Sequence, residues 1–158
     1  MSPRVNLPIQ IAALLVFAAF RIAAPGWWLM ILVFSLVGVI AIVLPSILAV
    51  VTLRRPRLTW PVAVPFLTGA VCLVVAGGLF PDFDDQRSYV PLLTVLGVDG
   101  DADGLLAGIG GVAVLGFLVS VVVTAVAMGV TAARRPATTP RRSPPETSPP
   151  ASNAAAST

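Results

Sequence analysis

The sequence predicts an all-α integral membrane protein, a four-helix transmembrane bundle followed by a disordered C-terminal tail. Hydrophobic residues make up 57% of the chain and charged residues only 11%, whereas an ordinary soluble domain carries roughly 25% charged residues. The apolar residues are gathered into long runs, most of them free of charge, that are each about as long as a membrane-crossing helix. Clusters of arginine end two of these runs. Together these features indicate that lipid rather than water surrounds most of the chain.

The first predicted span covers approximately residues 5–24. It crosses the bilayer only if Arg21 reaches the interface, so we interpret Arg21 as an interfacial anchor, with pairing to an acidic residue of the outer loop as the alternative. A cleaved signal peptide is the rival interpretation, because Arg4 precedes a short apolar core. The region around Arg21 and Pro25 makes a poor cleavage site, which favours an uncleaved helix.

Three further spans follow, at approximately residues 27–53, 58–80 and 104–133. Pro25 and Gly26 leave room only for a tight turn, which predicts an antiparallel hairpin of the first two spans. Proline is tolerated in membrane helices where neighbouring groups satisfy the backbone, and we expect kinks at Pro45 and Pro65.

The distribution of arginine predicts the orientation. Eight of the ten positive residues precede the first span, separate the second and third, or follow the fourth. Because cytoplasmic loops are enriched in positive charge, both termini are predicted to be cytoplasmic and the loop at 81–103 to lie outside. The positive residues are all arginine and the chain is rich in Ala, Gly, Pro and Val, a bias that indicates a GC-rich bacterial genome and hence a bacterial plasma membrane.

Two segments lie outside the spans. Residues 134–158 are rich in Pro, Ser, Thr and Arg with few large apolar side chains, so they are predicted to form a disordered cytoplasmic tail. Residues 89–96 of the outer loop are apolar enough to lie on the membrane surface or to tuck into the bundle. Pro91 argues against a regular helix there.

The outer loop contains a candidate metal site. Asp99, Asp101 and Asp103 are followed by Gly104, which matches the opening of the EF-hand calcium loop. The match fails at the twelfth position, where Gly110 stands in place of a bidentate Glu. At most, weak calcium binding is predicted. The simpler alternative is that the aspartates favour the dipole of the following helix and keep the loop outside.

The fourth span carries small residues at helical spacing. Small residues every fourth position form a groove that lets a second helix approach closely. This groove packs either against the chain's own helices or against a second copy or partner subunit. The candidate helix-packing residues are Gly104, Gly108, Gly111, Gly116 and Ser120.

The residues that common catalytic mechanisms require are missing from the sequence. It has no His, its one Glu lies in the tail, and its one cysteine, Cys72, lies in an apolar run. We therefore predict a non-enzymatic protein without a cofactor, apart from the weak calcium site. Three of the spans contain no ionisable group, which disfavours a coupled transporter, and no folded basic surface is available for nucleic acid.

The sequence thus leads to two functional hypotheses. The first is an accessory, structural or partner-binding protein that packs in the bilayer against itself or against a partner membrane subunit. The alternative is an extracytoplasmic cation sensor or a small-solute permeation subunit that uses the acidic outer loop.

Overall fold

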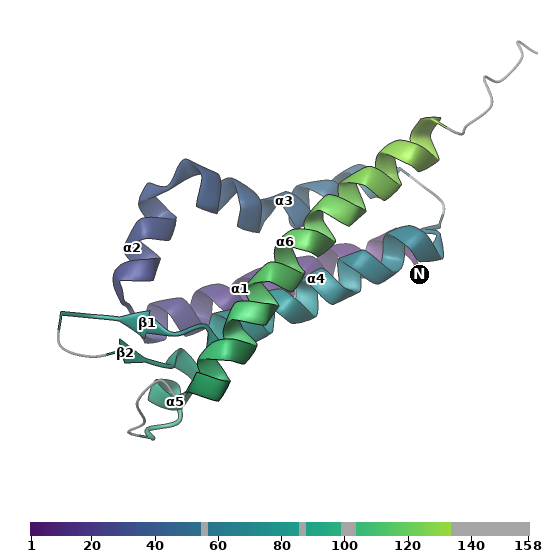
Figure 1. Cartoon of the computed structure of the whole chain (residues 1–158). Coiled ribbons are helices and arrows are strands. Elements are labelled where there is room, and N and C mark those ends of the chain that lie inside the picture. Colours follow the sequence, from purple (N-terminus) through teal and green to yellow (C-terminus); the bar gives the residue numbers. More distant parts are fainter. Residues whose placement is uncertain (55–56, 86–87, 99–103, 134–158) are drawn as a thin grey trace, which may run out of the picture.

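The computed structural model describes residues 1–54, 57–85, 88–98 and 104–133. Within these ranges the chain is almost entirely helical, which confirms the prediction of an all-α fold (Figure 1). The predicted tail at 134–158 lies outside the described residues. The elements are α1 (Pro3–Ala23), α2 (Trp27–Phe34), α3 (Leu36–Thr52), α4 (Trp60–Leu79), β1 (Asp82–Phe83), β2 (Ser88–Tyr89), α5 (Pro91–Val95) and α6 (Gly104–Ala133).

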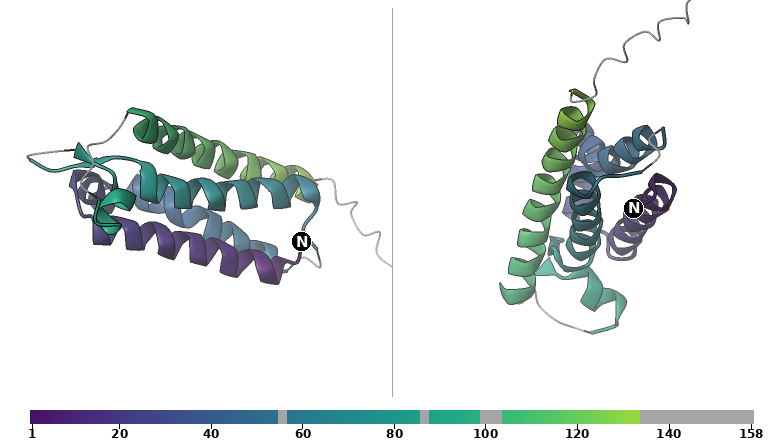
Figure 2. Two further views of the ribbon diagram at one scale, coloured as in Figure 1. Left: turned by 90° about the horizontal axis from the view of Figure 1, so that it is seen from below. Right: turned by 90° about the vertical axis from the view of Figure 1, so that its right-hand side faces the viewer.

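Among the described residues, three helices are long and apolar enough to cross a membrane, namely α1, α4 and α6, and α2 with α3 makes a fourth if the pair is one broken span. Figure 2 shows α4 lying between α1 and α6, and α4 packs against both. The predicted hairpin partners α1 and α3 are also in contact, but α4 is the main neighbour of α1. The long helices thus form a layered bundle compatible with a multi-pass membrane protein.

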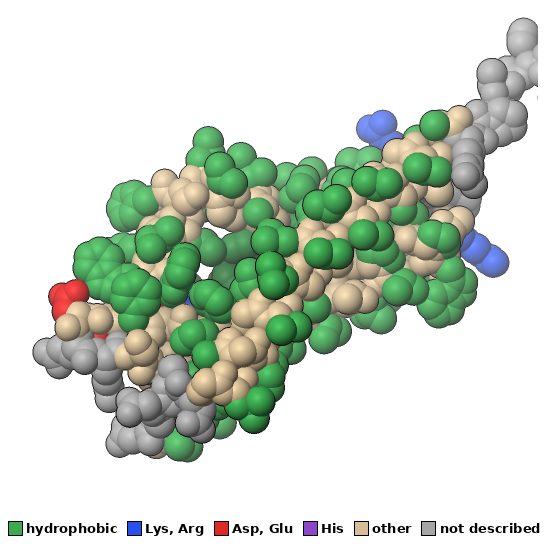
Figure 3. All heavy atoms as spheres, viewed as in Figure 1, with side chains coloured by type: hydrophobic (Ala, Val, Ile, Leu, Met, Phe, Trp, Pro, Cys, Tyr) green, Lys and Arg blue, Asp and Glu red, His purple; other side chains and the backbone are tan. Residues whose placement is uncertain are grey.

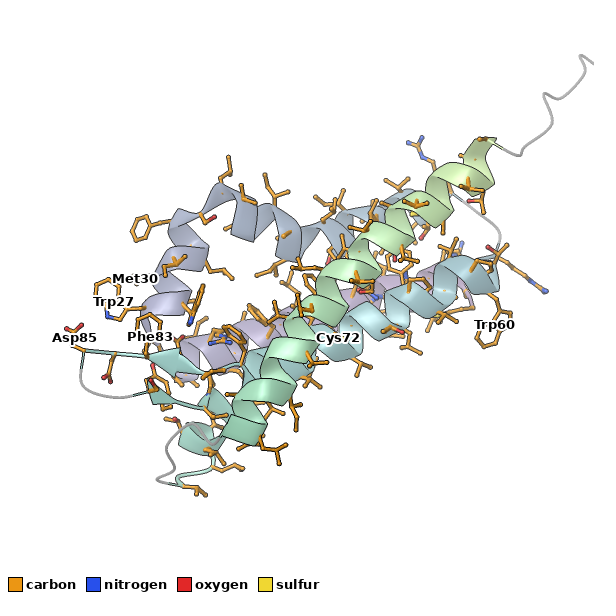
Figure 4. All side chains as sticks on the ribbon, in the orientation of Figure 1. Trp27, Met30, Trp60, Cys72, Phe83 and Asp85 are labelled. Atoms are coloured by element: carbon orange, nitrogen blue, oxygen red, sulfur yellow. The ribbon has the colours of Figure 1, made fainter. Side chains whose placement is uncertain are left out.

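The bundle has two distinct ends, which we name the loop end and the terminus end. The loop end carries β1, β2 and α5, and the terminus end holds the start of α1 and the end of α6 (Figure 1). Trp27 and Trp60 lie at opposite ends (Figure 4), as expected for aromatic residues at the two membrane interfaces. Large apolar side chains cover much of the surface (Figure 3), which suits a hydrocarbon environment.

The segment 27–53 is broken at Ser35. Helices α2 and α3 meet there at 81°. The Ser35 hydroxyl accepts a hydrogen bond from the backbone N–H of Gly38 at 3.2 Å, so Ser35 caps α3, while its own N–H still donates to Ile31 at the end of α2. Serine favours such caps because its side chain replaces a missing backbone partner. Helix α3 continues through Pro45 and α4 through Pro65.

The interior contains two apolar clusters. Towards the terminus end, Phe66 and Val62 of α4 pack with residues of α3 and α6. Nearer the middle, Phe17 of α1 and Phe117 of α6 pack against α4. Gly77 makes this approach possible, because a Cβ atom there would lie 3.0 Å from the Phe17 backbone. Small residues of α4 therefore let its neighbours come close.

A small antiparallel hairpin and a short helix close the loop end. Asp82 of β1 pairs with Tyr89 of β2, and α5 then packs against α1 and α4. The sequence argued against a helix in this apolar segment because of Pro91. The structure places Pro91 in the first turn of α5. Proline is tolerated there because the N–H that it lacks would have no partner within the helix.

Candidate functional site

A buried ion pair joins α1 to β1 at the loop end. Arg21 Nη1 lies 3.1 Å from Asp82 Oδ2, and the two side chains are only 5% and 0% exposed. Arg21 comes from the last turn of α1, and Asp82 follows the C-terminal end of α4 by three residues. The interfacial-anchor interpretation of Arg21 is therefore corrected, and its alternative, pairing with an aspartate of the outer loop, is the one that the structure supports.

Arg21 also binds the end of α4. Its Nη2 donates to the carbonyl oxygens of Ala76 at 3.1 Å and Phe80 at 3.0 Å, both at the C-terminal end of α4. The Ala76 carbonyl also accepts from the Phe80 N–H, so Arg21 is its second donor. A positive charge also suits the negative end of the helix dipole. The rings of Phe17 and Phe80 lie 5.8 and 5.7 Å from the guanidinium carbon. Arg21 thus ties α1 to α4 through charge, hydrogen bonds and aromatic contacts.

Asp82 accepts hydrogen bonds from two backbone groups besides Arg21. The N–H groups of Trp28 and Phe83 donate to its Oδ1 at 3.0 and 2.9 Å. Trp28 stands in the first turn of α2, whose free N–H groups and dipole favour an anion. Asp82 therefore holds the start of α2 and the end of α1 together.

The turn between α1 and α2 fits closely over this carboxylate. The Tyr89 hydroxyl donates to the Pro25 carbonyl at 2.6 Å, and a Cβ atom at Gly26 would overlap the Asp82 carboxylate. Only glycine leaves this space free. We name Arg21, Gly26, Trp28, Asp82 and Tyr89 the loop-end latch.

A second polar contact joins α1 to α4 further along the bundle. Gln10 Nε2 donates to the Phe66 carbonyl at 3.0 Å and lies 3.4 Å from Asn6 Oδ1. Both side chains are buried, and among the described residues Asn6 Nδ2 has no hydrogen-bond partner. We predicted no role for these two positions from the sequence. Two amide side chains four residues apart in an apolar helix were the available signal, because such residues commonly bind a neighbouring helix.

The candidate metal ligands Asp99, Asp101 and Asp103 lie outside the described residues. Within the described part of the chain, no group of three His, Cys, Asp or Glu side chains is placed to hold a metal ion. Asp82 belongs to the latch, and Asp85 accepts a hydrogen bond from the Trp27 indole at 3.1 Å (Figure 4).

The candidate packing residues of α6 divide into two sets. Gly116 and Ser120 face α4: a Cβ atom at Gly116 would lie 3.0 Å from Cys72 Sγ, and Ser120 lies against Gly69. Gly110, which the sequence analysis named only as a departure from the calcium motif, packs most tightly, since a Cβ atom there would lie 2.5 Å from the Phe80 backbone.

The other set of packing residues on α6 contacts no described helix. Around Gly104, Gly108 and Gly111, the described residues place no atom within 4 Å of where a Cβ atom would stand. Val112 and Leu115 on the same part of α6 are 71% and 64% exposed. We name Gly104, Gly108, Gly111, Val112 and Leu115 the open glycine face.

Comparison with known proteins adds no relative: no protein family matches the chain, and neither a curated protein nor a solved structure matches it significantly.

Proposed function

We propose that this chain is a non-enzymatic accessory protein of the bacterial plasma membrane, which uses the open glycine face to bind a transmembrane helix of another subunit or of a second copy. The observation that carries this proposal is the division of the α6 glycines. The space beside Gly110 and Gly116 is occupied by α4 and the residue that follows it, whereas no described residue occupies the space beside Gly104 and Gly108.

The spacing of the open glycines suits a helix as the partner. Gly104 and Gly108 lie one turn apart on the same side of α6. Glycine at this spacing lets two helix backbones approach, and van der Waals contact then provides association in lipid, where the hydrophobic effect between helices is absent. Val112 and Leu115 extend the same side with apolar side chains.

The chemistry of the interior agrees with a binding role rather than with catalysis or coupled transport. The charged pair inside the described bundle, Arg21 with Asp82, is engaged in holding α1, α2 and α4. A nucleophile with an adjacent general base has no candidate in the sequence, which lacks His entirely.

Photocrosslinking in native membranes tests the proposal. A photoreactive residue at Val112 should form an adduct with a partner helix. The control replaces Val130, which is 43% exposed and lies on the same side of α6 about five turns further along, at roughly 3.6 residues per turn. Val130 should give much less adduct.

The mass of the adduct identifies the partner. Twice the mass of this chain would show self-association, and any other defined mass would show a second subunit. Adduct at Val130 but not at Val112, or lipid adducts alone at both sites, would refute the proposed interface.

A further inference from the structure

A cavity of about 280 Å³ lies between the bent α2–α3 segment and the remaining long helices. Figure 3 shows the molecule hollowed between these elements. All four candidate spans contribute to the walls, for example through Phe17 of α1, Leu32 of α2, Ile42 of α3, Leu73 of α4 and Phe117 of α6. The 81° bend creates this space, because it carries α2 and the start of α3 away from α4 and α6.

The chemistry of the lining excludes water as the natural filling. Apart from the guanidinium of Arg21 and the indole of Trp28, the described lining residues are aliphatic, Phe or Gly. A buried water needs two to four polar partners. The described hydrogen bonds of Arg21 are already directed to Asp82 and to two carbonyl groups of α4.

The same pairing excludes an anionic group as the occupant. Asp82 already neutralises Arg21, so a phosphate or carboxylate entering the cavity would have to displace an ion pair that is 3.1 Å long and buried. An uncharged occupant leaves the latch intact. The required ligand is therefore apolar along its whole inserted length.

The volume and the surroundings favour one hydrocarbon chain. A dry cavity of roughly 150 Å³ is enough to bind benzene, and this one is nearly twice as large. The outer surface of the bend is covered by exposed apolar side chains such as Phe34, Leu36 and Val37, so the cavity adjoins a surface suited to lipid tails. An empty apolar space would lose the contacts that a tail provides.

We infer that the cavity is a binding site for one acyl chain of a membrane lipid, whose head group stays outside in the interface. The site is independent of the open glycine face. Val114 lines the cavity, whereas Val112, two residues earlier on α6, does not.

The test uses full-length protein in phosphatidylethanolamine–phosphatidylglycerol vesicles that contain a phospholipid with a mid-chain diazirine. After irradiation, mass spectrometry locates the adducts. Leu73 and Phe117 line the cavity but are only 4% and 5% exposed, so bulk lipid cannot reach them readily. We expect adducts on both, measured relative to the exposed Leu15 of α1, which lies outside the cavity and outside the open glycine face.

Two substitutions on different helices should fill the cavity, Val114→Trp on α6 and Ala41→Phe on α3. Each should lower the relative labelling of Leu73 and Phe117 on the order of tenfold, which corresponds to about 1.4 kcal/mol of binding free energy. Val71→Trp on α4 is the matched control and should leave this labelling unchanged, because Val71 is exposed and does not line the cavity.

The wild-type protein alone can overturn the inference, whatever the variants do. Adducts confined to exposed residues such as Leu15 would show that no acyl chain enters. Labelling of Leu73 and Phe117 that survives both filling substitutions would show that the lipid reaches these residues by another route and would equally refute the site.

Discussion

Removing the charge of Asp82 should destabilise the protein strongly. Asp82→Asn keeps an oxygen that can accept from Trp28 and Phe83, but it leaves Arg21 buried without its counter-charge. Removing one partner of a buried ion pair costs about 3–5 kcal/mol. At roughly 2–4 °C per kcal/mol for a chain of this size, the melting temperature in mild detergent should fall by roughly 6–20 °C.

Asp85→Asn is the matched control, since it makes the same chemical change in the same loop. Asp85 is exposed and accepts a hydrogen bond only from the Trp27 indole among its described contacts, so its loss should lower the melting temperature by a small fraction of that amount. The double variant Arg21→Met with Asp82→Asn should recover part of the loss, because no unpaired charge then remains. If Asp82→Asn melted like Asp85→Asn, the latch would not hold the bundle together.

Two further predictions concern packing and topology. Gly110→Ala should destabilise the protein by about 1–3 kcal/mol because its Cβ atom meets the Phe80 backbone, whereas Gly111→Ala should change the melting temperature little, and equal effects of the two would contradict the described α4–α6 contact. A phosphatase fused to the C-terminus should be inactive, because the arginine distribution predicts a cytoplasmic tail, and an active fusion would reverse the orientation.

The sequence predicted the long helices well, because each depends on one-dimensional signals. Apolar length marks α1, α4 and α6, and the arginines after α3 and α6 mark where a span must end. The break at Ser35 was not predicted. A serine in an apolar run can face lipid, bond to its own helix or cap a new helix, and the choice depends on what lies around it.

The candidate site was only partly predictable, for the same reason. That Arg21 and Asp82 both lie at the loop end follows from the predicted topology, and their pairing was foreseen as an alternative. Which aspartate pairs depends on how the turn at Gly26 folds over the carboxylate. Likewise, their spacing in the sequence made Gly104, Gly108 and Gly116 equally good candidates for helix packing. Only the position of α4 shows which of these glycines already contacts a helix and which does not.

The most direct test of the proposed function is a quantitative pull-down from native membranes in mild detergent, comparing the wild type with Gly108→Leu and Gly129→Leu. Both glycines lie on α6 without a described neighbour within 4 Å of an added Cβ atom, but Gly129 stands near the terminus end, outside the open glycine face. We expect that Gly108→Leu loses the bound partner, or the second copy, at unchanged melting temperature, while Gly129→Leu retains it. Full retention by Gly108→Leu, or loss only with Gly129→Leu, would contradict the proposal.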